Sequence, residues 1–288
     1  MPQTRRGVFY ASAAFLSVTI VAFWVGARPF APVTARDVAA PQVMAVADAV
    51  GGLDAPSPDR LIELARRDPL GFVALAHEQY EKTIRAYRCT FTKQERLDNE
   101  LTAVQEVELR FRRDPLSIYL LWRKNAVACK RALFMEGGKF VDSDGQKLAR
   151  VEPHGLARLV VADIMMPIDG RDAQKASRHP ITRAGFGPFF DMLDHYNALA
   201  ATNGVLDFRY AGTGEVAGRA TLIFTRALPF APGGPYPDAW LVTHFDKQTL
   251  LPIAVYSYAD RQEQTLLGRY IYTDIELNPD FADDAFKF

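Results

Sequence analysis

Apolar and polar residues alternate along many short stretches of the chain, which is the pattern of β-strands with one dry face and one wet face. In residues 103–111, for example, Val107, Leu109 and Phe111 fall on one face, opposite a row of charged side chains. Gly, Pro, Asn and Asp residues separate the stretches, as expected for turns. The pattern predicts about ten strands, at residues 89–97, 103–111, 117–123, 131–136, 139–141, 205–210, 215–225, 240–245, 253–258 and 266–277.

Three segments instead have the 3.6-residue period of an amphipathic helix. A short helix is predicted at residues 61–66, and Asp68-Pro69 separates it from a longer helix at residues 69–87. A third helix is predicted at residues 182–201. Its aromatic face is more typical of core packing than of a binding surface, and it comprises Phe186, Phe189, Phe190, Leu193 and Tyr196.

The N-terminal residues carry a targeting segment. Arg5 and Arg6 precede twenty residues without a charge, residues 8–27, and about 1.5 Å per residue gives this run roughly 30 Å, enough to cross a bilayer. Two alternatives remain for residues 1–28: an uncleaved inner-membrane anchor formed by residues 8–27, or a signal peptide cleaved near Ala27. In either case the positive charge ahead of the run predicts that the rest of the chain is exported to the periplasm or cell envelope.

The remaining residues divide into a linker and one domain. Residues 29–58 are rich in Ala, Pro and Val, which predicts a flexible linker. In residues 59–288 the strands and helices do not alternate as they do in βαβ folds. The sequence therefore predicts an α+β domain with one curved antiparallel sheet and helices on one face.

The chain contains none of the common motifs of catalysis or metal binding. It lacks the G-x-S-x-G elbow, the H-E-x-x-H zinc motif, the P-loop and the dinucleotide fingerprint. Each of the five histidines is best explained by a structural role. With 34 basic and 34 acidic residues the formal net charge is zero, which indicates no nucleic-acid partner. We expect a protein that is not an enzyme and needs no cofactor or metal.

Two cysteines, Cys89 and Cys129, are present in the whole chain. In an exported protein such a pair often forms a disulfide, which over this loop would stabilise the fold by about 3–4 kcal/mol. The alternative is two buried free thiols, because Cys packs well as a small apolar residue. The expected compartment slightly favours the disulfide.

A series of short motifs runs in order through residues 72–288. It comprises Tyr87 to Arg96, Arg112 to Tyr119, Met135 to Gly138, Arg178 to Thr182 with Gly185, Val216 to Arg219, Leu251-Pro252 and Tyr270 to Asn278. Together these motifs resemble the bacterial domain of unknown function family 1571, although the segment at Cys129-Lys130 lacks an expected Gly-Arg-Glu. That family is similar in turn to the periplasmic lipoprotein-carrier (outer-membrane lipoprotein-sorting) superfamily. The resemblance implies a half-barrel of about ten strands, its concave face covered by two or three helices.

A half-barrel of this kind implies a lipid or lipoprotein ligand whose acyl chain lies in the concavity. Strand alternation selects the inward-facing residues, and the helix at residues 182–201 is the expected lid. The predicted ligand-binding residues are Val107, Leu109, Phe111, Ile118, Leu120, Ile223 and Tyr272 on strands and Phe186, Phe189 and Phe190 on the helix. The alternative is an envelope protein-interaction, sensor or scaffold domain with a filled concavity and an exposed patch at residues 229–236.

Overall fold

The computed structural model describes residues 57–155, 162–282 and 284–287 of the chain. The targeting segment predicted at residues 1–28 and most of the predicted linker lie outside the described residues. Among the helices of the described part, none is both long enough and apolar enough to cross a membrane.

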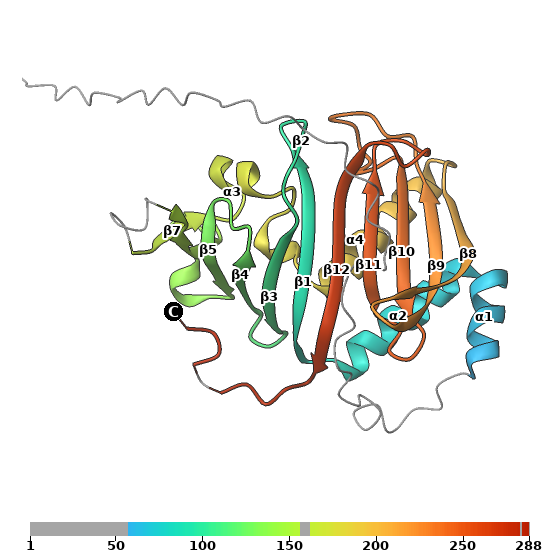
Figure 1. Cartoon of the computed structure of the whole chain (residues 1–288), viewed down its shortest axis with the longest axis horizontal. Helices are drawn as coiled ribbons and strands as arrows, with labels where there is room; N and C mark the ends of the chain where they lie inside the picture. Colours follow the sequence, from blue (N-terminus) through green and yellow to red (C-terminus); the bar gives the residue numbers. More distant parts are fainter. Residues whose placement is uncertain (1–56, 156–161, 283, 288) are drawn as a thin grey trace, which may run out of the picture. The chain divides into compact units, whose positions relative to one another are not determined.

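Twelve strands of the described residues form one antiparallel sheet (Figure 1). Their order is β7-β6-β5-β4-β3-β1-β12-β11-β10-β9-β8, and β2 pairs only with β1. The order begins and ends on different strands, so the sheet is open. The bounds are β1 (Ala86–Leu97), β2 (Glu100–Leu101), β3 (Gln105–Arg112), β4 (Ser117–Lys124), β5 (Cys129–Met135), β6 (Leu148–Pro153), β7 (Ile164–Pro167), β8 (Asp207–Val216), β9 (Arg219–Ala227), β10 (Trp240–Asp246), β11 (Pro252–Tyr258) and β12 (Leu266–Leu277).

The first and last long strands meet in the middle of the sheet (Figure 1). β1 pairs with β12 on one side and β3 on the other, so that Phe91 lies opposite both Tyr272 and Val107. The other neighbours, from β3 to β7 and from β8 to β12, follow one another in sequence. The β1–β12 pairing therefore joins an N-terminal half of the sheet, β1 to β7, to a C-terminal half, β8 to β12.

Four α-helices and two 3-10 helices accompany the described part of the sheet. They are α1 (Pro58–Arg67), α2 (Pro69–Thr83), α3 (Arg171–Ala176), α4 (Phe186–Thr202), η1 (Gly138–Phe140) and η3 (Ile181–Arg183). Asp68 lies between α1 and α2 and caps the start of α2. Its carboxylate accepts a hydrogen bond from the Gly71 N–H at 2.8 Å. Pro69 holds the first position of α2, where no backbone donor is needed.

The second helix ends at Thr83, four residues earlier than predicted. The Asn278 side chain donates a hydrogen bond to the Thr83 carbonyl at 2.8 Å and accepts one from the Arg85 N–H at 2.7 Å. These bonds satisfy backbone groups at the helix end, and the chain then enters β1. Tyr87 therefore faces the core from β1 and not from a helix. The predicted helix was too long because buried residues keep a helix-like spacing across the junction between α2 and β1.

Helices α2 and α4 lie against the C-terminal half of the sheet (Figure 1), and aromatic side chains fill the space between them. Phe72 on α2 stacks on Phe224 at 4.8 Å between ring centroids and meets the Phe245 ring edge-on at 5.5 Å. Phe190 on α4 lies 6.1 Å from the Phe245 ring and 5.7 Å from the Tyr80 ring. All five side chains are buried, and each such burial contributes about 1.5–3 kcal/mol. This half of the concavity is a packed core.

Two predicted strands differ from the structure. The stretch at residues 215–225 spans two strands, because Ala217 (φ 48°) and Gly218 (φ 79°) form a tight turn between β8 and β9. The stretch at residues 139–141 contains the end of η1 in place of a strand. The predicted α+β class, a curved antiparallel half-barrel with helices, is confirmed.

Candidate functional site

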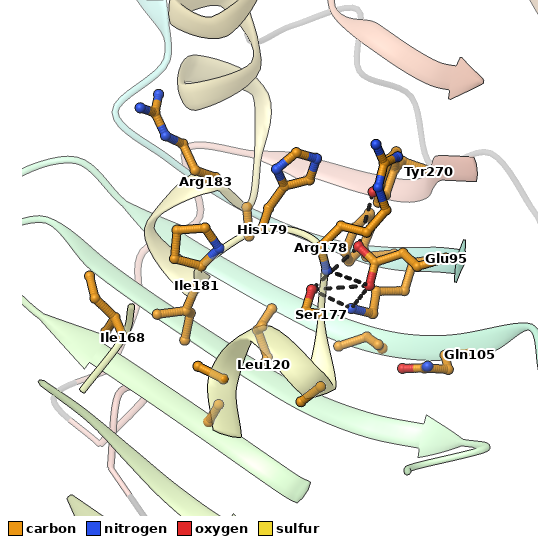
Figure 2. A pocket seen from close by; sticks show the side chains of 18 of the residues that line it. Glu95, Gln105, Leu120, Ile168, Ser177, Arg178, His179, Ile181, Arg183 and Tyr270 are labelled. Atoms are coloured by element: carbon orange, nitrogen blue, oxygen red, sulfur yellow. Dashed lines mark hydrogen bonds and ion pairs between the residues drawn. The ribbon is translucent and has the colours of Figure 1, made fainter. Parts of the chain in front are cut away.

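The N-terminal half of the sheet bounds a cavity of about 320 Å³. Its floor is formed mainly by β1 and β3 to β7, with contributions from β10 to β12. Its opposite wall is residues 171–185, which we call the cover segment; it contains α3 and η3 and crosses over the strands (Figure 2). The start of α4 closes one side through Phe189.

Small side chains face each other across this cavity. The lining alanines are Ala128, Ala132 and Ala149 on the sheet side and Ala173, Ala176 and Ala184 on the cover segment. Protein interiors are otherwise close-packed, and phenylalanine rings fill the neighbouring half of the concavity. The difference in side-chain volume accounts for the space left between the cover segment and the sheet.

Exposed apolar residues mark the mouth of the cavity. Val127, between β4 and β5, is 60% exposed and Ile164, at the start of β7, is 41% exposed, and both line the cavity. Strand register places them at the end of the sheet where Lys93 pairs with Gln105 and Ile164 pairs with Val151. The apolar interior is therefore open to solvent at that end of the strands.

A buried ion pair lies at the same end of the sheet. The Lys93 Nζ and Glu95 Oε2 atoms are 2.9 Å apart, and 7% and 2% of these two side chains are exposed. Glu95 also accepts hydrogen bonds from the Ser177 hydroxyl at 3.0 Å and the Tyr270 hydroxyl at 2.9 Å. Figure 2 shows Ser177, Tyr270 and the backbone of Arg178 converging on the Glu95 carboxylate. Glu95 thereby fastens the cover segment to the sheet.

The electrostatics keep Glu95 ionised. Burial by itself would raise the pKa of Glu95, but the charge of Lys93 and hydrogen bonds from Lys93 and Tyr270 lower that pKa below its ordinary value. Burial and the adjacent Glu95 charge raise the pKa of Tyr270 well above its ordinary value, so its hydroxyl keeps its proton and donates. The cluster is thus a charged pair with neutral donors around it.

A second ion pair is buried behind the cavity wall. The Arg226 guanidinium lies 3.3 Å from both an Asp238 carboxylate oxygen and the Asn197 amide oxygen. Ser257 donates a hydrogen bond to Asp238 at 3.5 Å. Asp238 lines the cavity, and its charge is balanced by Arg226.

Two arginines of the cover segment line the cavity without a carboxylate partner among the described residues. Within the described part of the chain, the Arg178 guanidinium donates to the Ser257 hydroxyl at 3.4 Å and the Pro237 carbonyl at 3.2 Å. Arg183 is exposed, and no described residue makes a hydrogen bond or ion pair with its side chain. His179 lies between them in sequence, and Figure 2 shows the Arg183 side chain on the other side of His179 from Arg178 and directed away from it.

His179 is neutral at pH 7. Burial, followed by the charge of Arg178, lowers the pKa of His179 from 6.5 to about 4, against the opposing effect of Glu95. Arg183 also acts in the lowering direction. The imidazole can therefore offer one donor and one acceptor, whereas the two guanidinium groups carry the positive charge.

The ten predicted ligand-binding residues fall into three groups. Those that line the cavity are Val107, Leu120, Phe189 and Tyr272. Those buried in the core away from the cavity lining are Leu109, Phe111, Ile118, Phe186 and Phe190. Ile223 is half-buried on the other face of β9 from Leu222 and Phe224, beside Gly214 and His244, so its inward placement was wrong.

Sequence reasoning missed the polar residues of the site. Lys93 and Glu95 continue the inward row that begins at Phe91, and two charged residues on an apolar face are a sign of a buried ion pair. In the sequence, the motif that begins at Arg178 indicates only the family resemblance, and the pattern around His179 favours a structural role. The position of this motif over the cavity depends on contacts between residues that are distant in sequence, and a local pattern carries no information about such contacts.

The predicted Cys89–Cys129 disulfide is absent, and both thiols are free. Cys89 lies on β1 and Cys129 on β5, with β3 and β4 between them. Three strand spacings of about 4.8 Å exceed the reach of a disulfide, about 7 Å between Cα atoms. Burial raises the pKa of both thiols, that of Cys129 to about 12. Among the described residues, no group of three His, Cys, Asp or Glu side chains is arranged to hold a metal ion.

Solved structures of similar arrangement share little sequence with this chain. MucB is 17% identical, with a TM-score of 0.43; the match covers 83% of this chain and 64% of that chain, so this chain spans less than two thirds of MucB. The lipoprotein LppX of Mycobacterium tuberculosis is 11% identical, with a TM-score of 0.40 and coverage of 75% and 100%. A putative outer membrane lipoprotein-sorting domain from Vibrio parahaemolyticus is 9% identical, with a TM-score of 0.35 and coverage of 75% and 94%.

The comparison of sequences, unlike the comparison of structures, identifies a family. No curated protein matches this chain. Residues 84–288 match the family described as protein of unknown function (DUF1571), which is the family that the series of motifs resembles. The match covers β1 to β12, including all of the cover segment and its polar cluster. The chain therefore belongs to the DUF1571 family.

Proposed function

We propose that this protein is an exported, non-enzymatic envelope protein that binds the acyl chain of a lipid or lipoprotein in the cavity beneath the cover segment. The observation that carries the proposal is the apolar cavity of about 320 Å³, open at one end through Val127 and Ile164. Small-molecule sites typically enclose about 300–1,000 Å³ and are lined mainly by apolar side chains. The cavity is within this range, at its lower end, which suits one acyl chain.

The energetics favour an alkyl tail. Burial of a methylene group contributes about 0.8 kcal/mol, so about ten methylenes contribute roughly 8 kcal/mol. Association and ordering of the tail cost several kcal/mol in return. The balance is well below 8 kcal/mol, which corresponds to a dissociation constant weaker than about 1 μM and is suitable for a carrier that must also release its ligand.

The cover segment determines whether a tail can enter. Its links to the floor include the hydrogen bonds from Ser177 and the Arg178 N–H to Glu95. These bonds are polar and local, whereas the facing alanines provide little packing. We infer that a tail enters from the mouth at Val127 and Ile164 and lies between the alanines, without displacing the packed core under α2 and α4.

Export rests on the N-terminal sequence. Arg5 and Arg6 followed by the uncharged residues 8–27 support a signal peptide or an inner-membrane anchor within residues 1–28, with residues 29–58 as a linker. An anchored domain would take its ligand beside the inner membrane, whereas a cleaved one could carry it across the periplasm. The mass of the mature protein distinguishes these two arrangements.

A domain that acts through protein contacts is the second candidate. The filled C-terminal half of the concavity favours it, since that half leaves no space for a ligand. The loop at residues 229–236 offers a small patch at most, because Tyr236 is buried and bonded through its hydroxyl to Asn203. The open N-terminal half favours a lipid ligand.

Lipid extraction and mass spectrometry of the full chain, purified from its native envelope, test the proposal. We expect an acyl lipid at close to one per protein, and saturable binding of a fluorescent fatty acid after the lipid is removed. Absence of both a co-purifying lipid and saturable binding would contradict the proposal and leave the protein-interaction domain as the better account.

A further inference from the structure

The charges that line the cavity do not all balance locally. Lys93 is paired with Glu95, and Asp238 is paired with Arg226. The remaining charged lining residues are Arg178, Arg183 and Asp172, all on the cover segment. Two cations and one carboxylate are thus left without an ion-pair partner in the described part of the chain.

The Arg178 guanidinium has N–H donors left to bind a ligand. A guanidinium has five N–H donors, and the side chain of Arg178 uses two of them, at 3.4 Å to Ser257 and at 3.2 Å to Pro237. Both acceptors are neutral, and the site is half-buried. A cation partly removed from water gains most from a charged acceptor, because such hydrogen bonds are shorter and stronger than neutral ones.

Arg178 also lies at the appropriate place. Its backbone N–H is bonded to Glu95, at the end of the sheet where Val127 and Ile164 open the cavity. Arg183 lies farther along the cover segment, next to Gly185, which packs against Tyr87 and Phe111 towards the opposite end of the strands. A polar headgroup beside Arg178 would remain near water while its tail reached the alanines.

We propose that Arg178, beside the neutral His179, forms an anion-binding site at the cavity mouth, so that the ligand is an amphiphile with a carboxylate or phosphate headgroup. This inference rests on the proposed function, because it assigns the headgroup of the same acyl ligand. Asp172 and the paired carboxylates Glu95 and Asp238 limit the site to one small anion, since they repel further negative charge.

Three probes of equal chain length test the headgroup: dodecanoate, dodecyl phosphate and the uncharged 1-dodecanol. Each displaces a fluorescent apolar probe from the purified full-length protein. We expect the two anionic probes to bind at least about tenfold more tightly than 1-dodecanol, and the advantage to shrink as salt is raised. Equal affinity for all three probes would overturn the headgroup inference and leave the proposed function standing.

Two single variants assign the effect to the site. R178Q should reduce the anionic preference to about threefold or less while 1-dodecanol binding is retained. R171Q removes the same charge from an exposed residue of the same segment that does not line the cavity, and it should keep the full preference. Loss of preference in both variants, or in neither, would overturn the site. If R178Q fails to fold, R178K should still weaken the preference, because it keeps the charge but loses the paired N–H donors of the guanidinium.

Inorganic phosphate distinguishes a lipid headgroup from a free anion. At the concentrations where dodecyl phosphate displaces the probe, inorganic phosphate should have no effect. Equal potency of the two would show that the tail contributes nothing, which contradicts an amphiphile as ligand. Failure of all three amphiphiles to bind would overturn this inference together with the proposed function.

Discussion

Glu95 on β1 accepts a hydrogen bond from the Ser177 hydroxyl at 3.0 Å, although 82 residues separate them in sequence. This contact joins the floor of the cavity to the cover segment and lies beside the buried Lys93 ammonium. The cavity lining is mostly apolar, whereas the contacts that hold the cover segment to the sheet at Glu95 are polar. Mutations can therefore alter the lining and these contacts independently.

Removing the Glu95 charge should strongly destabilise the protein. In E95Q the buried Lys93 ammonium loses its counter-ion, which typically costs about 3–5 kcal/mol. Urea denaturation measures the free energy of unfolding. The matched control is E106Q, because Glu106 pairs with Lys124 on the exposed face, where 67% of the lysine side chain is accessible. That change should cost less than about 1 kcal/mol. Equal losses in the two variants would contradict a buried, structural role for Glu95.

Acidification should destabilise the protein in part through His179. The pKa of His179 is about 4 in the folded protein against 6.5 for the free side chain, so between these values the unfolded state binds more protons. Stability from this group is present above pH 6.5 and is lost as the pH falls towards 4. Glu95 acts in the same direction below its ordinary pKa of 4.5.

Comparison of urea unfolding at pH 7.5 and pH 5 isolates the histidine contribution. H179Q keeps a neutral polar side chain, so its free energy of unfolding should fall less than that of the wild type between the two pH values. Identical pH dependence in the two proteins would mean that His179 is not held neutral by its surroundings.

Filling the cavity should abolish acyl-chain binding without unfolding the protein. Ala132 lines the floor of the cavity, so A132L places extra side-chain volume where the tail would lie. We expect at least about tenfold weaker binding of a fluorescent fatty acid, with the free energy of unfolding unchanged or increased, because added methylenes gain buried contacts. The control A198L adds the same volume on the exposed side of α4 and should leave binding unchanged. Unaltered binding by A132L would place the ligand elsewhere.

Both cysteines should titrate as free thiols. Under denaturing, non-reducing conditions we expect two reactive thiols per chain, and in the folded protein slow reaction of both, because burial raises the pKa of each thiol. Cys129 lines the cavity, so a bound fatty acid should slow its labelling further while Cys89 is unaffected. Absence of free thiols in the denatured, unreduced chain would show instead that the two cysteines form a disulfide.

The sequence predicts most of the sheet but not the site. Strict alternation identifies β3, because every second residue faces the core, and the resemblance supplies the family. β6 and β7 were missed since neither alternates cleanly: β7 reads Ile164-Met165-Met166-Pro167, with exposed and half-buried residues mixed. Local patterns also could not separate residues of the packed core, such as Phe190, from residues of the cavity, such as Phe189, because adjacent positions on one helix face different parts of the concavity.

Tryptophan fluorescence provides the most direct test of an acyl chain in the cavity. Trp122 lines the cavity, and W24F/W240F leaves it as the only one of the three tryptophans in the chain. A bromine-labelled fatty acid quenches indole fluorescence only on close contact. The account predicts saturable quenching of Trp122 that reaches its limit at one fatty acid per protein and disappears in A132L. No quenching, or quenching that rises without saturation and is unchanged by A132L, would contradict a ligand in this cavity.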